Sequence, residues 1–305
     1  MSTPTNPYRL ARTVVPSAYR ISITPDLDGS TFAGEVHVDV QVSETVTSIV
    51  LNALELTLGA LTVSAGESSV SSREPVLDAT YETATFDLDD PLGPGPATLH
   101  LAFEGTLNDL LVGFYRSTYV DPSGTSHTIA TTQFEHTDAR RAFPCFDDPA
   151  LKATYEIDLT VPSALSAYSN SPEVASVDLG DGRRRVSFAP TMKMSTYLVA
   201  FVAGDFEETA PVDVNGTALR VIYPIGKGHL TSLALEMGAF ALDFFATYFD
   251  IAYPGEKMDM VAIPDFAFGA MENLGLVTYR ETALLLDPAL ASLAEKKRVS
   301  EVVAH

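Results

Sequence analysis

A short segment near the end of the chain, Phe268 to Gly275 (FGAMENLG), contains residues that could take part in chemistry. It places one carboxylate, Glu272, and one amide, Asn273, between two glycines in an apolar neighbourhood. A carboxylate with few polar competitors forms strong charge-assisted contacts with a cation. Taken alone, however, the segment is interpreted more simply as a surface turn, and Glu135 further upstream as an ordinary strand acid.

Histidine and cysteine spacing does not define a second site. The single cysteine, Cys145, is interpreted as a buried small hydrophobe, with a catalytic thiol paired to His136 as the less favoured alternative. His37 and His100 occupy outward strand positions and are interpreted as solvated. No two histidines have the four-residue helical spacing of a metal site. The six are His37, His100, His127, His136, His229 and His305.

Composition argues against several classes of function. The chain has 40 acidic and 19 basic residues and a net charge of -21, which repels phosphate backbones and anionic membrane surfaces. We therefore expect neither nucleic acid nor a membrane as a partner. One cysteine cannot form an intrachain disulfide, and residues 1–20 lack the apolar run of a signal peptide. These features favour a cytoplasmic protein.

The elements that position these residues follow two patterns, the first of which is alternation. Up to about residue 205, apolar residues alternate with polar ones, as in Val36, Val38 and Val40, and turn residues such as Asp28-Gly29 separate the runs. Half-buried strands are typical of this pattern. It predicts an N-terminal domain, residues 1–205, built as an antiparallel multi-sheet or sandwich structure.

From residue 206 onward a helical period appears. Apolar residues at three- and four-residue spacing predict one face of a helix over Leu230–Phe249, which we expect to be stopped by Tyr253-Pro254-Gly255. The residues of this face are Leu233, Met237, Phe240, Phe244 and Tyr248.

Two strand-like segments follow that helix, at Met260 to Ile263 and at Leu276 to Tyr279. Ser292 to Glu295 then has the pattern of a capping box that opens a last helix, in which the chain ends. The sequence thus predicts a mainly β protein followed by an incomplete α/β domain, residues 206–305.

Four longer stretches resemble zinc aminopeptidases of the aminopeptidase N family. Residues 132–149 (TQFEHTDARRAFPCFDDP) are similar to a long family signature, and residues 193–201 (KMSTYLVAF) to the strand that leaves its first domain. Residues 263–273 (IPDFAFGAMEN) carry its GAMEN exopeptidase motif, and residues 302–305 (VVAH) lie where its H-E-x-x-H begins. The order and spacing of these stretches fit the family from about residue 8 to the last residue.

The resemblance implies that the second domain is the start of a thermolysin-like catalytic domain and that peptide N-termini are the partners. Glu272 and Glu135 would then hold the substrate's α-ammonium, and Gln133 would line the pocket for its first side chain. The backbone of Gly269 and Ala270 would lie along the substrate as an extra strand. Met271 and Asn273 complete the GAMEN motif and belong to the same expected binding segment.

His305 corresponds, by the same resemblance, to the family's first zinc ligand. The general-base glutamate, the second histidine and the glutamate ligand that follow it in the family are not in this chain. One imidazole does not hold zinc, for which three protein ligands are usual. We therefore expect zinc in a full-length enzyme but not in this chain. We expect this chain, lacking a C-terminal part of the same protein, to be inactive alone.

Two alternatives remain at this point. A non-catalytic binding or scaffold protein could retain the fold without the metal site, although it would not need Glu272, Glu135 and Gln133. The family's leukotriene hydrolase branch has glycine where this chain has Ala270, which favours an aminopeptidase. Leu274 stands where the family usually has an aromatic residue, a departure from the family pattern in the expected cleft.

Overall fold

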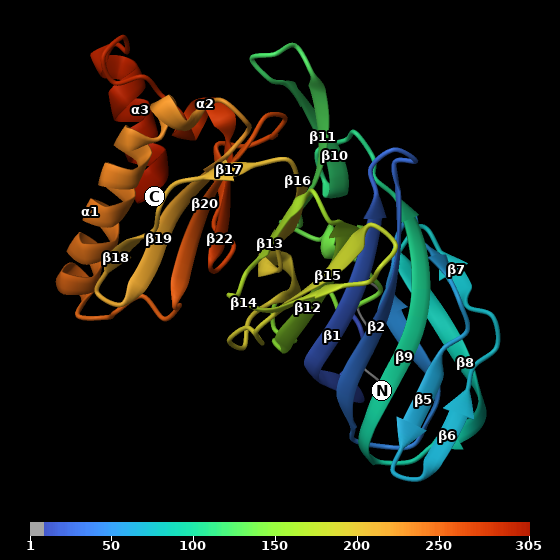
Figure 1. Cartoon of the computed structure of the whole chain (residues 1–305). Coiled ribbons are helices and arrows are strands. Elements are labelled where there is room, and N and C mark those ends of the chain that lie inside the picture. Colours follow the sequence, from blue (N-terminus) through green and yellow to red (C-terminus); the bar gives the residue numbers. More distant parts are fainter. Residues whose placement is uncertain (1–8) are drawn as a thin grey trace.

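The computed structural model describes residues 9–305, so that the first eight residues of the expected N-terminal domain lie outside the described residues. Strands dominate, and those within residues 9–305 form four sheets (Figure 1). The predicted mainly β fold is confirmed. None of the described helices is both long enough and apolar enough to cross a membrane.

The largest sheet has nine strands and contains the alternating segments of the sequence. Val36 and Val38 are buried, because side chains alternate between the two faces of a strand. Most neighbours are antiparallel as predicted, but β1 and β12 run parallel, which alternation does not reveal. In sheet order the strands are β14 (Glu173–Asp178), β15 (Arg183–Phe188), β12 (Thr154–Pro162), β1 (Val14–Asp26), β2 (Thr31–Val42), β9 (Gly95–Thr106), β5 (Thr62–Ala65) and β6 (Ser68–Ser71), with β4 (Thr57–Leu58) beside β9.

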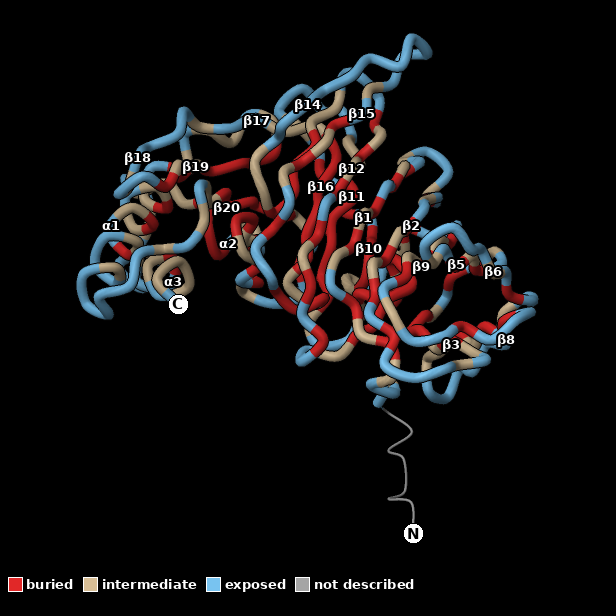
Figure 2. The backbone as a smooth tube through the Cα atoms, turned by 90° about the horizontal axis from the view of Figure 1, so that it is seen from below, coloured by how far each residue is buried: buried red, intermediate tan, exposed pale blue. Residues whose placement is uncertain are grey.

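Two smaller sheets complete this part of the chain. One consists of β3 (Val46–Asn52), β8 (Thr83–Leu92) and β7 (Val76–Asp78), and the other of β10 (Gly113–Val120), β11 (Ser126–Gln133), β16 (Phe201–Gly204) and β13 (Ser166–Ser169). The buried rings of Phe114 on β10 and of Phe134, just after β11, both pack on Phe201 of β16. The β10–β11 hairpin projects from the body of the molecule (Figure 1), whereas the tube in Figure 2 shows β11 and β16 deeply buried at the centre. Cys145 is buried, as expected for a small hydrophobe.

A six-stranded mixed sheet organises the rest of the chain. Its strands are β17 (Glu207–Glu208), β19 (Thr217–Tyr223), β20 (Lys257–Ile263), β22 (Leu276–Arg280) and β21 (Ala270–Met271), with β18 (Val212–Val214) beside β19. β20 runs parallel to both β19 and β22. The division at residue 205 stays a prediction about domains, and it falls between β16 of one sheet and β17 of another.

Helices α1 (Ser232–Phe249), α2 (Glu281–Leu284) and α3 (Leu293–Ala304) accompany this sheet, and three short 3-10 turns lie at Ala139–Arg141, Thr196–Leu198 and Gly228–Leu230. Figure 1 shows α1 and α3 side by side next to β19. The predicted capping box of α3 is confirmed, since Ser292 and Glu295 bond each other's backbone. The last turn of α3 packs through Val302 and Val303 against a buried cluster to which α1, α2 and the strands β19, β20 and β22 contribute.

Helix α1 is confirmed, and it ends at Phe249 as predicted. The expected stop signal is wrong, because Asp250 takes a left-handed conformation and ends the helix before Tyr253-Pro254-Gly255 is reached. Three members of the predicted apolar face, Phe240, Phe244 and Tyr248, stack on one another and are exposed. The buried residues of the helix are instead small ones, Ala234, Gly238 and Ala241.

Candidate functional site

The GAMEN segment forms an edge of the six-stranded sheet. Strand β21 pairs antiparallel with β22, with Ala270 opposite Tyr279 and Met271 opposite Thr278. Just before it, the carbonyl of Gly269 accepts a hydrogen bond from the backbone N–H of Arg280. Among the described residues no strand pairs with the other side of β21. Its backbone is therefore available for a further extended segment.

The loop that leads into β21 is held by the β10 strand. The Asp265 carboxylate accepts hydrogen bonds from the Ser117 hydroxyl at 2.8 Å and from the Thr118 backbone N–H at 3.1 Å. The Tyr115 hydroxyl donates to the Asp265 carbonyl at 2.9 Å, and the Asp265 N–H donates to Ser117. The Arg280 guanidinium donates to the carbonyls of Phe266 and Ala267. These contacts fix where β21 begins relative to the preceding sheet.

The turn between β21 and β22 explains two residues of the FGAMENLG segment. Asn273 is buried, and its side-chain amide donates to the Leu276 carbonyl and the Thr278 hydroxyl, both at 3.3 Å. Gly275 has a φ of 77°, and a Cβ there would lie 1.9 Å from the Asn170 carbonyl oxygen. Asn273 therefore holds the turn, while Gly275 permits close contact with the neighbouring sheet.

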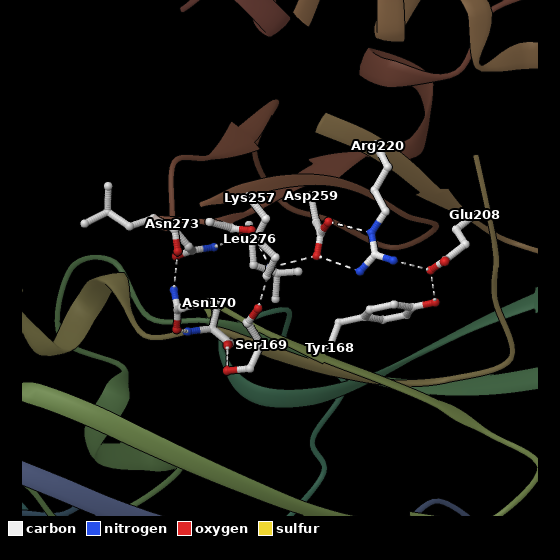
Figure 3. A network of polar contacts seen from close by, with 12 residues as sticks. Tyr168, Ser169, Asn170, Glu208, Arg220, Lys257, Asp259, Asn273 and Leu276 are labelled. Carbon is white, nitrogen blue, oxygen red and sulfur yellow. Dashed lines mark hydrogen bonds and ion pairs between the residues drawn. The ribbon is translucent and has the colours of Figure 1, made fainter. Parts of the chain in front are cut away.

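A network of polar contacts holds this turn against the neighbouring sheet (Figure 3). Lys257, whose side chain is 11% exposed, donates from Nζ to the carbonyls of Ser169 and Gly275 and to the Asp259 carboxylate, at 2.7 to 2.8 Å. Asp259 also accepts two hydrogen bonds from Arg220, which pairs with Glu208. Burial lowers the pKa of Lys257, although the neighbouring Asp259 carboxylate acts in the opposite direction.

Sequence reasoning missed this network. Lys257 and Asp259 are two residues apart on β20, so alternation places both side chains on the same face of that strand. A lysine and an aspartate so placed in an otherwise apolar strand are a signal that could have identified this ion pair.

The two candidate ammonium-binding carboxylates lie in different surroundings. Glu272 is exposed although its neighbours in the sequence are apolar, while Glu135 is half-buried just after β11. Within residues 9–305 neither carboxylate has a hydrogen bond or an ion pair. Burial of the Tyr279 ring raises the pKa of its phenol, and the negative charge of the nearby Glu272 raises it further.

Gln133 and Met271 are both buried, but their side chains have different surroundings. Gln133 ends β11, and its side-chain oxygen Oε1 is shielded from solvent without a hydrogen-bond partner among the described residues. A buried amide oxygen without a partner is costly, so this atom is a candidate to meet a ligand or a water. Met271 instead packs in a cluster with Tyr115 and Ile129 of the β10–β11 hairpin.

An open cavity of about 750 Å³ brings several of these residues together. Gly269, Ala270 and Glu272 line it on one side and His305, exposed after the end of α3, on another. Glu301, one helical turn before His305, also lines the cavity and was missed in the sequence. Gln133 and Glu135 are not part of its lining.

Comparisons with known proteins agree with this architecture. Residues 15–198 match the family described as "Peptidase M1 N-terminal domain", and residues 233–305 match "Peptidase family M1 domain". The chain is 43% identical to "Aminopeptidase M1" of Arabidopsis thaliana over 301 residues, covering 97% of this chain and 34% of that protein. It is 40% identical to "Puromycin-sensitive aminopeptidase" of Caenorhabditis elegans, covering 97% of this chain and 32% of that protein. The chain thus spans about a third of the length of these relatives.

Proposed function

Because the chain belongs to the peptidase M1 family, we propose that it carries the part of an aminopeptidase that recognises the free N-terminus of a peptide. The whole protein would remove N-terminal residues from peptides, in the cytoplasm as the composition favours. The observation that carries this proposal is the open edge of β21 beside Glu272, on the same cavity as His305.

The peptide backbone would pair with the free side of β21. An extended substrate can add to a sheet edge through main-chain hydrogen bonds, which do not depend on its sequence. A Cβ at Gly269 would meet Arg298 and Val302 at no less than 3.5 Å, so packing within the chain does not require glycine there. The glycine is better explained by the close approach of a ligand backbone.

Glu272 would hold the ammonium group, with Glu135 as the second anchor and Gln133 facing the first side chain. Both carboxylates lack partners among the described residues, and the surplus of acidic residues draws cations toward the protein. Because Glu272 is exposed, each such contact competes with water, and we expect a modest contribution of up to about 1 kcal/mol.

The zinc implied by the resemblance does not fit the residues that this chain supplies. His305 offers one nitrogen at the cavity, and no cluster of three ligand side chains includes it within residues 9–305. Three protein ligands are usual for a zinc site that activates water. His305 alone therefore does not make a zinc site here, and the inactivity of this chain alone stays a prediction.

Binding of a short peptide to the 305-residue chain tests the proposal. A titration of trialanine followed by NMR should give tighter binding than a titration of N-acetyl-trialanine, which lacks the ammonium. Glu272→Gln should weaken the binding of trialanine about two- to fivefold, the loss expected for an exposed charge pair, without affecting the acetylated peptide.

Glu301→Gln is the matched control, because Glu301 lines the same cavity from α3. It should leave the preference for the free amine intact. Equal binding of the two peptides by the wild-type chain would contradict the proposal, as would an equal effect of the two substitutions.

A further inference from the structure

Far from the GAMEN edge, two histidines and a glutamate meet on the outward face of the nine-stranded sheet. Glu35 and His37 lie on β2, and His100 lies directly opposite His37 on β9. Val36, which lies between Glu35 and His37 on β2, is buried, and so is Leu101, which follows His100 on β9. The expectation of two solvated histidines is therefore incomplete, because both rings are half-buried.

The side chains of Glu35, His37 and His100 lie close together. The two imidazole rings are stacked with centroids 4.3 Å apart and planes 14° from parallel. One potential ligand atom from each of Glu35, His37 and His100 lies within 4.8 Å of the others. Nε2 of His100 is shielded from solvent and has no hydrogen-bond partner among the described residues, and the nearest carboxylate oxygen, Oε2 of Glu35, is 3.5 Å away.

Neighbouring charges leave this cluster available for a cation. Arg20 of β1 lies opposite His37, but both of its terminal nitrogens bond the Asp39 carboxylate, at 2.7 and 3.0 Å. The Thr98 hydroxyl also bonds Asp39. On the other side His100 faces uncharged Thr62 of β5. Glu35 therefore remains the carboxylate directed at the histidines, and it has no other ion-pair partner among residues 9–305.

We propose that Glu35, His37 and His100 form a binding site for a divalent transition-metal ion such as zinc. Two imidazoles and one carboxylate are a donor set that zinc accepts, with water in the remaining position. Magnesium and calcium prefer oxygen ligands and would be poor competitors. An ion bound here ties β2 to β9 across the sheet, and the site is independent of the proposed peptide-binding function.

Small side-chain movements suffice to close the site. Zinc–nitrogen bonds of 2.0–2.1 Å require ligand atoms about 3.3 Å apart in a tetrahedral arrangement, closer than the present separation of up to 4.8 Å. The parallel rings must tilt so that their nitrogens converge. The side chains of Glu35 and His100 are 60% and 41% exposed, so this movement meets little packing resistance.

Calorimetric titration of the chelator-treated 305-residue chain with zinc tests the site. We expect one equivalent to bind to the wild-type chain. His37→Ala and His100→Ala should each weaken binding by more than the roughly 10- to 100-fold that loss of an outer-shell partner costs. Glu35→Gln should weaken it less than either histidine replacement. Imidazole NMR signals of His37 and His100 should shift together on addition of zinc.

His305→Ala and His229→Ala are the controls, since both remove an exposed histidine outside the cluster. They should leave the main binding event unchanged, and thermal unfolding without metal checks that every variant folds. Absence of zinc binding by the wild-type chain, or binding that survives loss of both His37 and His100, would overturn the proposal. Loss of zinc binding in His305→Ala alone would mean that zinc binds at the peptide-binding cavity, and it would also overturn the proposal.

Discussion

At the scale of single residues, Gly275 illustrates how backbone geometry and packing act together. Its φ of 77° costs an L-residue about 1–2 kcal/mol, and a Cβ would also collide with the Asn170 carbonyl. We expect Gly275→Ala to lower the free energy of unfolding by about 3–4 kcal/mol. Urea unfolding at equilibrium measures this change.

Gly180→Ala is the matched control, because Gly180 also has a φ of 77° but a Cβ there would meet nothing within 4 Å. It should cost only the conformational part, about 1–2 kcal/mol. Equal losses for the two variants would mean that the contact with Asn170 adds nothing.

The sequence identified the segment but not the surroundings of each residue. Motif order located Glu272 and Ala270 on one stretch, and both do line the cavity. The exposure of Glu272 and the structural amide of Asn273 depend on how β21 turns into β22. That turn is set by contacts with Asn170 and Lys257, which are distant in the sequence and leave no local pattern.

At the scale of elements, the β10–β11 hairpin is fastened by a histidine between two carboxylates. His127 of β11 contacts Asp205 through Nδ1 at 2.8 Å and Asp121 through Nε2 at 3.1 Å. The hydrogen bond to Asp205, followed by that to Asp121, raises the pKa of His127. A histidine with a raised pKa in the folded state contributes fully below its unfolded value of 6.5, and the contribution is lost as pH rises through the folded value.

Replacing His127 by glutamine should therefore destabilise the protein most at low pH. The difference in free energy of unfolding between wild type and His127→Gln should shrink as pH rises from about 5 to about 9. Urea unfolding across this range measures it, with exposed His229→Gln as the control. A difference that stays constant or grows with pH would contradict the assignment.

Helix α1 shows what periodicity can and cannot predict. The spacing of Phe240, Phe244 and Tyr248 placed them on one helical face, and their stacked rings confirm this. The helix instead packs against the sheet at Gly238, where an added Cβ would lie 2.9 Å from the Met260 side chain. Close helix–sheet packing favours small residues, so the most apolar face need not be the buried one.

At the scale of the whole molecule, Lys257 links the four-stranded and six-stranded sheets. Its Nζ reaches the Ser169 carbonyl on β13 and the Gly275 carbonyl in the β21–β22 turn, and it pairs with Asp259, whose side chain is 1% exposed. Lys257→Met keeps an apolar stem but removes three hydrogen bonds. Since it also leaves a buried carboxylate with Arg220 as its remaining partner, we expect a loss of about 3 kcal/mol.

The same substitution tests whether this link makes the two parts of the chain unfold together. In wild type we expect one cooperative urea transition, and in Lys257→Met an earlier transition for residues 206–305, detectable by hydrogen exchange of the amides of β20 and β22. Arg183→Met is the control, because Arg183 pairs with Asp181 at an exposed site, where a much smaller loss is expected. A Lys257→Met chain as stable as Arg183→Met would show that the remaining contacts between the sheets, such as Tyr115 and Ser117 with Asp265, are sufficient to hold them together.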